Sequence, residues 1–196
     1  MPKQDAVLAI TGGIDLMEMQ QPLNLLWELL LPAMGSEPLA NDEASQQRLA
    51  EKLSALTLPL VQGQATSPIS SQLSGRTYTV DRNELDIETI TLDFADFDCT
   101  VWVKTAIGEE IIPCGYGTWQ QGQSTLFNRP WLFDPTPIVA CGAWTAEDSF
   151  TMVVRLYETP FFHTLTFHFA GDELMVETGV NVSFEASDIL LTARLL

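Results

Sequence analysis

From Arg76 to the C-terminus, apolar and polar side chains alternate, and this period of two constrains the fold more than any other feature of the chain. Within the segment 87–94, for instance, Ile90 and Leu92 fall on one face of an extended strand. Short segments of turn-forming residues, such as 106–109, separate the alternating stretches, so neighbouring strands are expected to be antiparallel. An open sheet of about eight or nine strands would leave two unpaired edges. We therefore expect a mainly β protein with N-terminal helices, whose antiparallel meander closes as a small lipocalin-like β-barrel or bends into a strongly curved sheet.

The residues before this region carry a different pattern. Residues 5–13 include five consecutive apolar residues, which predicts a strand that is covered on both faces. Residues 22–31 predict a very apolar helix, and residues 41–56 predict a second helix that begins at an asparagine N-cap. The segment 57–75 is rich in Pro, Ser, Gln and Gly and is interpreted as a linker along a surface. The chain is therefore expected to divide into three parts, 1–34, 35–75 and 76–196.

Composition excludes several classes of function. The chain has 196 residues, 46% of them hydrophobic, and a formal net charge of -17. The apolar content is sufficient for a packed core, whereas the acidic charge repels phosphate backbones and anionic lipids. We expect neither nucleic acid nor a membrane as a partner. No apolar run of about 18 residues predicts a membrane span, and the N-terminus lacks the pattern of a signal peptide, which leaves the cytoplasm as the default compartment.

The histidines and one acidic cluster are candidates for metal binding. His163 and His168 lie five positions apart in one predicted strand, so their side chains leave opposite faces and cannot share a metal. We expect His163, next to a turn, to be exposed and His168 to lie on a face of the barrel. The cluster of Asp93, Asp96 and Asp98 lacks the glycine and the closing glutamate of an EF-hand loop. No metal site and no cofactor are therefore predicted.

Motifs of nucleophilic catalysis are absent from the sequence. A Ser-x-x-Lys nucleophile needs a lysine three residues after a serine, but Leu49 and Val101 occupy that position before Lys52 and Lys104. The chain also contains no Gly-x-Ser-x-Gly, no Gly-x-Gly-x-x-Gly and no P-loop. We assign no catalytic or cofactor-binding residue and expect no enzymatic activity. The sequence leaves open a triad that uses one of the two histidines, although no motif supports one.

The tryptophans of the β region suit a different role. Trp102 and Trp144 are the candidates for the lining of a ligand pocket, because aromatic side chains offer large apolar surfaces. The alternative is that both belong to the core, as aromatic side chains on strands usually do.

The N-terminal segment resembles the end of a known family. Residues 5–12, followed by the Leu-rich stretch 23–33 with Trp27 near its middle, resemble the final strand and C-terminal helix of penicillin-binding-protein-like serine hydrolases. These are relatives of class C β-lactamases and esterases. The segments 74–78 and 169–172 resemble parts of the β-rich C-terminal extension that some of these proteins carry. The family's Ser-x-x-Lys, Tyr-x-Asn and Lys/His-x-Gly motifs have no match in this chain.

The resemblance implies a non-catalytic C-terminal accessory domain of such a hydrolase, which packs on a missing catalytic lobe and shapes substrate access. In this interpretation, residues 1–34 are the last strand and helix of that lobe. Two alternatives stay open. The β region is a lipocalin-like barrel that encloses a small apolar ligand, or the chain is a structural domain that self-associates as a homodimer through residues 5–31, whose backbone and apolar face lack partners.

Overall fold

The computed structural model describes most of the chain as two compact units. The described residues are 1–14, 16–35, 40–127, 134–183 and 188–196. The first unit spans Met1–Pro59 and the second spans Leu60–Leu196.

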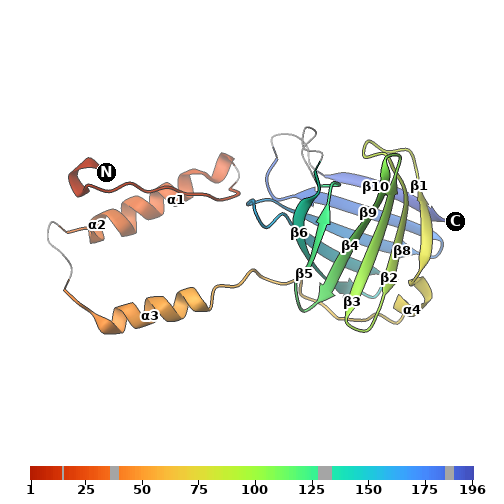
Figure 1. The fold of residues 1–196 in the computed structure, drawn as a ribbon, viewed down its shortest axis with the longest axis horizontal. Coiled ribbons are helices and arrows are strands. Elements are labelled where there is room, and N and C mark those ends of the chain that lie inside the picture. The colour runs from red at the N-terminus through yellow and green to blue at the C-terminus, as the bar shows by residue number, and fades with distance from the viewer. Residues whose placement is uncertain (15, 36–39, 128–133, 184–187) are drawn as a thin grey trace. The chain divides into compact units, whose positions relative to one another are not determined.

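The first unit is helical where it is regular (Figure 1). Its elements are η1 (Pro2–Gln4), η2 (Leu16–Glu18), α1 (Gln20–Leu25), the π-helical η3 (Leu26–Leu30), α2 (Leu31–Ala33) and α3 (Glu43–Ser54). The helix predicted over residues 22–31 is thus present as the continuous run α1–η3–α2. The second predicted helix begins one residue later than expected, because Asp42 is the N-cap and its carboxylate accepts a 3.0 Å hydrogen bond from the backbone N–H of Ser45. Among the described residues, no helix combines the length and the apolar character needed to cross a membrane.

The strand predicted over residues 5–13 is not formed. The described part of Met1–Pro59 contains no strand that could pair with this segment. A run of five apolar residues indicates that the segment favours burial. A strand also needs a neighbouring strand for its backbone hydrogen bonds. Val7 is 95% exposed and Ile10 is 53% exposed, so the segment is not covered either. The homodimer through residues 5–31 stays a prediction.

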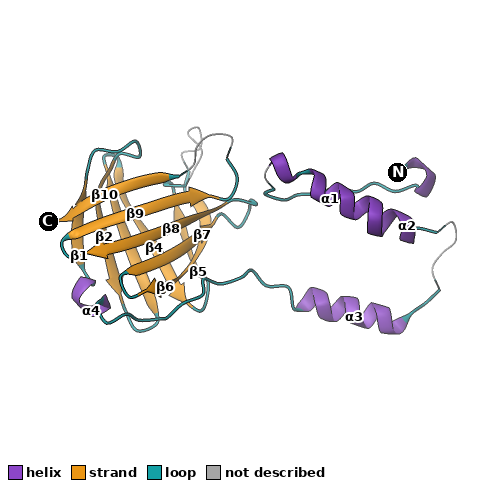
Figure 2. Ribbon diagram, turned by 180° about the vertical axis from the view of Figure 1, so that it is seen from behind, coloured by secondary structure: helices purple, strands orange, loops and turns teal. Residues whose placement is uncertain are grey.

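The second unit contains a short helix, α4 (Ser70–Leu73), and the sheet. The strands among the described residues are β1 (Arg76–Val80), β2 (Ile87–Phe94), β3 (Asp98–Thr105), β4 (Gly108–Tyr116), β5 (Gln120–Ser124), β6 (Thr136–Ala146), β7 (Ser149–Arg155), β8 (Phe162–Ala170), β9 (Glu173–Val180) and β10 (Ile189–Leu195). Figure 2 shows these strands wrapping around a common interior, with α4 at one end. The predicted mainly β fold with a small, lipocalin-like antiparallel barrel is confirmed.

Two strand pairs close the barrel. β1 pairs with β10 in antiparallel fashion, whereas β4 meets β6 in a short parallel pairing that includes Tyr116 and Gly142. Nine of the described strands form the ring, and β5 pairs with the first half of β6 along the same edge. In a pure meander, β4 would pair only with β3 and β5. Here β5 pairs with the first half of β6, and β4 pairs with the residues of β6 that follow.

The segment predicted as a linker lies against the barrel where it approaches β6. The backbone N–H of Gln64 donates to the carbonyl of Trp144 at 2.9 Å, and the N–H of Trp144 donates back at 2.8 Å. Gly63 allows this approach, since a Cβ at that position would lie 2.4 Å from the Trp144 carbonyl oxygen. Gln64 therefore pairs with the edge of β6 through an isolated antiparallel bridge.

One end of the barrel is filled by aromatic side chains. The ring centroid of Phe94 lies 4.9 Å from that of Trp144 and 5.3 Å from that of Phe150. Phe169 also contacts Trp144, with centroids 5.8 Å apart. Leu73 of α4 belongs to the same buried core. Because these large rings occupy the interior here, an internal cavity can form only toward the other end.

Candidate ligand-binding site

A cavity of about 640 Å³ lies inside the barrel, away from the aromatic end. Its apolar wall includes Ile90, Val101, Met152, Leu165, Phe167 and Leu191. Cavities that hold small molecules in proteins commonly measure roughly 300–1,000 Å³ and are mostly apolar. The size and the lining of this cavity fit that class of site.

Alternation along the strands explains which side chains reach the cavity. On β8, the side chains of His163, Leu165 and Phe167 line the cavity, while Thr164 and Thr166 do not. Successive side chains of a strand leave opposite faces, so every second residue points into the barrel. The same rule places Glu110 on the inner face of β4, where its register partner is Val103 of β3.

Glu110 brings a carboxylate to the cavity wall. Its Oε1 and Oε2 accept hydrogen bonds from the backbone N–H of Thr125 at 3.1 and 3.2 Å, and the Thr125 hydroxyl also donates to Oε1. Thr125 directly follows β5 and lines the cavity as well. These donors hold the carboxylate in place, but a carboxylate has about four acceptor positions, so it keeps the capacity to accept further hydrogen bonds.

His163 is the second polar group in this wall. Its ring lies against Phe127, with centroids 4.9 Å apart. Desolvation by burial lowers the pKa of His163 from the ordinary 6.5 to about 4, so the imidazole is neutral at neutral pH. The expectation that His163 is exposed is wrong. Although it lies near a turn, His163 is two residues from Leu165 on β8, so both side chains point inward. His168, of the opposite parity, lies on the outer face.

Acidification should destabilise the barrel through His163. The pKa of this residue is about 4 in the folded protein and near 6.5 when unfolded, so the unfolded chain binds more protons between these values. Stability is therefore lost as the pH falls through this window. His163→Leu should abolish about 2 kcal/mol of the loss between about pH 7 and pH 4.5. Urea unfolding at both pH values measures it; equal losses in both proteins would exclude His163 as the cause.

The two tryptophans proposed for a pocket lie elsewhere. Trp144 is 2% exposed and belongs to the aromatic cluster at the filled end of the barrel. Trp102 is half-buried on β3, between the buried, inward-facing Val101 and Val103, so its side chain lies on the outer face. Neither lines the 640 Å³ cavity.

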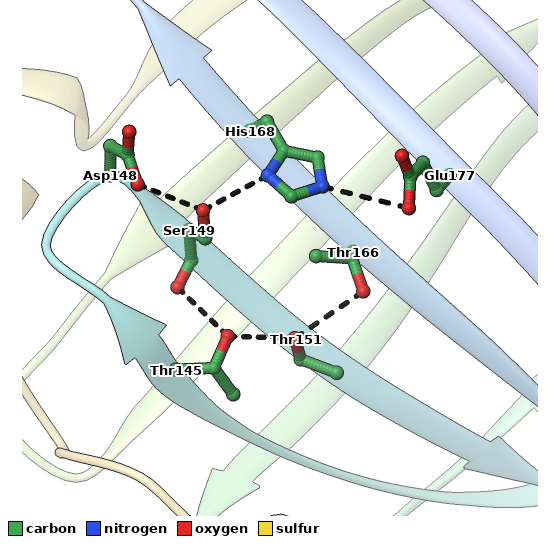
Figure 3. Close-up of polar contacts among 7 residues, drawn as sticks. All are labelled: Thr145, Asp148, Ser149, Thr151, Thr166, His168 and Glu177. Atoms are coloured by element: carbon green, nitrogen blue, oxygen red, sulfur yellow. Dashed lines mark hydrogen bonds and ion pairs between the residues drawn. The ribbon is translucent and has the colours of Figure 1, made fainter.

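A polar network on the outer face of β6 to β9 includes a serine, a histidine and two acids (Figure 3). Ser149 Oγ lies 2.9 Å from Nδ1 of His168 and 2.9 Å from Oδ1 of Asp148. Nε2 of His168 lies 3.8 Å from Oε2 of Glu177, beyond hydrogen-bonding distance. The hydroxyl of Thr151 contacts the hydroxyls of its neighbours Thr145 and Thr166.

This network has the residue types of a catalytic triad without its geometry. A triad needs a histidine that is free to take the serine proton and an acid hydrogen-bonded to its other nitrogen. Here Asp148 competes for the single proton of Ser149, and Glu177 is too far from His168. Ser149 is 8% exposed and does not line the interior cavity. It also does not line a second pocket, whose lining includes Thr166 and Glu177. The contacts instead connect neighbouring strands on the outer face.

The cysteines are buried within the barrel wall. Cys99 and Cys114 are register partners on β3 and β4, and both carry free thiols, as does Cys141. Burial raises the pKa of Cys99 and of Cys114, which keeps these thiols protonated and unreactive. Among the described residues, no group of three or more His, Cys, Asp or Glu side chains is placed to hold a metal ion.

A closed β-barrel with one filled end and an apolar interior cavity defines a lipocalin-like class of fold. The chain is similar to the fatty acid binding protein of Schistosoma mansoni, solved in complex with arachidonic acid, with 9% identity and a TM-score of 0.50 over 65% of this chain and 98% of that one. The extracellular fatty acid binding protein As-p18 is 12% identical, with a TM-score of 0.49 over 67% and 99% of the two chains. A brain fatty-acid-binding protein of Drosophila melanogaster is 10% identical, with a TM-score of 0.47 over 62% and 98%.

These identities are low, so the likeness describes the fold alone. The sequence matches no family model and no curated protein. The resemblance to penicillin-binding-protein-like hydrolases is wrong, because the solved structures that the chain resembles are fatty-acid-binding barrels. Its main support, a strand over residues 5–12 that leads into an apolar helix, fails since that strand does not form. An apolar helix with a central tryptophan is too common a pattern to identify a family.

Proposed function

We propose that the barrel binds a small apolar molecule in its interior cavity. The observation that carries this proposal is the cavity of about 640 Å³ whose wall is mostly apolar. Each Å² of apolar ligand surface removed from water contributes about 25 cal/mol, so an apolar molecule gains affinity by entering such a space. Binding is what the site's chemistry supports, because a mostly apolar wall offers a ligand mainly hydrophobic contacts.

The fold comparison supports the same function. The Schistosoma mansoni protein, which has the same fold, was solved with arachidonic acid, an apolar chain that ends in a carboxylate. That ligand belongs to that protein. What it contributes here is that a barrel of this architecture can hold a long apolar molecule.

A matched pair of substitutions on β8 tests the proposal. Leu165 faces the cavity and Thr164 faces outward, so Leu165→Trp fills the cavity while Thr164→Trp adds the same side chain outside it. With the neutral fluorophore Nile red, we expect saturable binding to the unmodified protein. Leu165→Trp should weaken this binding by at least about tenfold, which corresponds to the loss of about 1.4 kcal/mol of contacts. Thr164→Trp should leave it unchanged.

Fluorescence titration measures these affinities. The absence of saturable Nile red binding, or equal binding by both tryptophan variants, would contradict an interior site. Circular dichroism of both variants shows whether the barrel remains folded.

A further inference from the structure

The charged side chains among the described residues of the cavity lining are all acidic. The described residues of the lining include two acids, Asp86 and Glu110, and no lysine or arginine. The histidine in the wall, His163, adds no positive charge at neutral pH, since burial holds its pKa near 4. Arg155 of β7 stacks over the ring of Phe162 with 4.4 Å to its centroid, a contact on the outer face of the strands.

An anionic ligand would find no lysine or arginine among the described residues of this wall. Moving a carboxylate from water into an apolar space is costly unless a cation or several hydrogen-bond donors compensate it. Two donors that could have served, the backbone N–H and the hydroxyl of Thr125, already bind Glu110. The Glu110 carboxylate would moreover repel a second carboxylate in the same low-dielectric space.

A cationic ligand finds the opposite situation. Glu110 keeps acceptor capacity beside its bonds to Thr125, and an ammonium group offers three donors together with a complementary charge. A neutral imidazole such as that of His163 can accept a hydrogen bond through one ring nitrogen. Resting on the proposed function, we infer that the cavity selects apolar molecules that end in an amine, recognised by Glu110, and discriminates against fatty-acid carboxylates.

Three probes with the same twelve-carbon chain test this inference: dodecylamine, dodecanol and dodecanoate, each below its micelle concentration. Their displacement of Nile red from the unmodified protein gives the relative affinities. We expect dodecylamine to bind at least about tenfold more tightly than dodecanoate, because a buried opposite charge favours the amine and a like charge disfavours the acid. Dodecanol measures the contribution of the apolar chain alone.

A pair of neighbouring variants assigns the effect to one side chain. Glu110→Gln removes the inward charge but keeps an oxygen that can accept from Thr125, whereas Glu109→Gln removes an exposed charge one residue away. Glu110→Gln should abolish most of the tenfold preference for dodecylamine over dodecanoate, with each affinity expressed relative to that of dodecanol for the same variant. Glu109→Gln should keep the preference, which controls for general attraction of amines to a chain with net charge -17.

The possible outcomes separate this inference from the proposed function. Dodecanoate binding as tightly as dodecylamine would overturn the inference, while saturable binding of dodecanol would keep the barrel a binding protein. A preference that survives Glu110→Gln, or that is lost equally in Glu109→Gln, would overturn the role of Glu110. If neither Nile red nor dodecanol binds, the proposed function fails and the inference fails with it. Should Glu110→Gln not fold, the comparison of the three probes on the unmodified protein still decides the selectivity.

Discussion

Phe150→Ala is expected to lower the free energy of unfolding by about 3–5 kcal/mol, the usual cost of deleting a buried aromatic ring. Phe150 is fully buried, at 0% exposure. Its ring centroid lies 5.3 Å from Phe94, 5.6 Å from Trp144 and 6.2 Å from Tyr116. Deleting the ring removes its own buried area and leaves a cavity whose rigid aromatic walls cannot collapse into it. Urea unfolding followed by tryptophan fluorescence measures the loss.

Val153→Ala serves as the control for this substitution. Val153 lies on the same strand, β7, but with the parity of the outer face, and it is half-buried. We expect it to lose less than about 1 kcal/mol, because the removed methyl groups are partly in water already. Similar losses for the two variants would mean that the aromatic end contributes no more to stability than the outer face. Since Phe150 does not line the 640 Å³ cavity, Phe150→Ala should also retain Nile red binding under conditions where it is folded.

Gly142→Val should be destabilising by about 3 kcal/mol, at the upper end of what overpacking costs. Gly142 sits where β4 meets β6, opposite Tyr116. A Cβ there would lie 2.5 Å from the tip of the Phe150 ring and 2.8 Å from the sulfur of Cys114. Neither group can move freely, because Phe150 and Cys114 are both fully buried in the packed core. The substitution would therefore push the two strands apart at the parallel contact that closes the ring.

Gly108→Val is the matched control for the closure. Gly108 begins β4, and a Cβ at this position would meet no atom within 4 Å. Its replacement should change the free energy of unfolding by no more than about 1 kcal/mol. Thermal unfolding of both variants measures the difference. If Gly142→Val were tolerated as well as Gly108→Val, then close contact between β4 and β6 would not be required for barrel stability.

The strands of the barrel could be predicted because their signal is local. Ile90 and Leu92 alternate with threonines along β2, and this apolar face lies toward the core, with both side chains at most 3% exposed. The prediction of a strand over residues 5–13 was wrong because pairing of a strand is not a local property. Apolar residues between 5 and 13 satisfy the composition of a buried strand, but the pairing partner is a property of the rest of the molecule.

The polar residues of the cavity could not be located from the sequence. Residues 109–112 read Glu-Glu-Ile-Ile, so a strand here places one glutamate and one isoleucine inward in either parity. Pairing with β3 decides that Glu110 and Ile112 face the interior, while Ile111 is 52% exposed. His163 follows two phenylalanines, and only the register of β8 shows that it points inward. The available signal was the shared parity of His163 with Leu165.

The sequence by itself determined that the region after Arg76 forms mainly antiparallel strands, most of which are joined by short turns, because side-chain alternation and turn residues act between neighbours in the chain. Only the tertiary structure decided where the ring closes, which end aromatic rings fill, and that a carboxylate lines the remaining cavity. These features depend on the register between strands and on contacts such as that of Gly142 with Phe150 and Cys114, which join residues far apart in sequence.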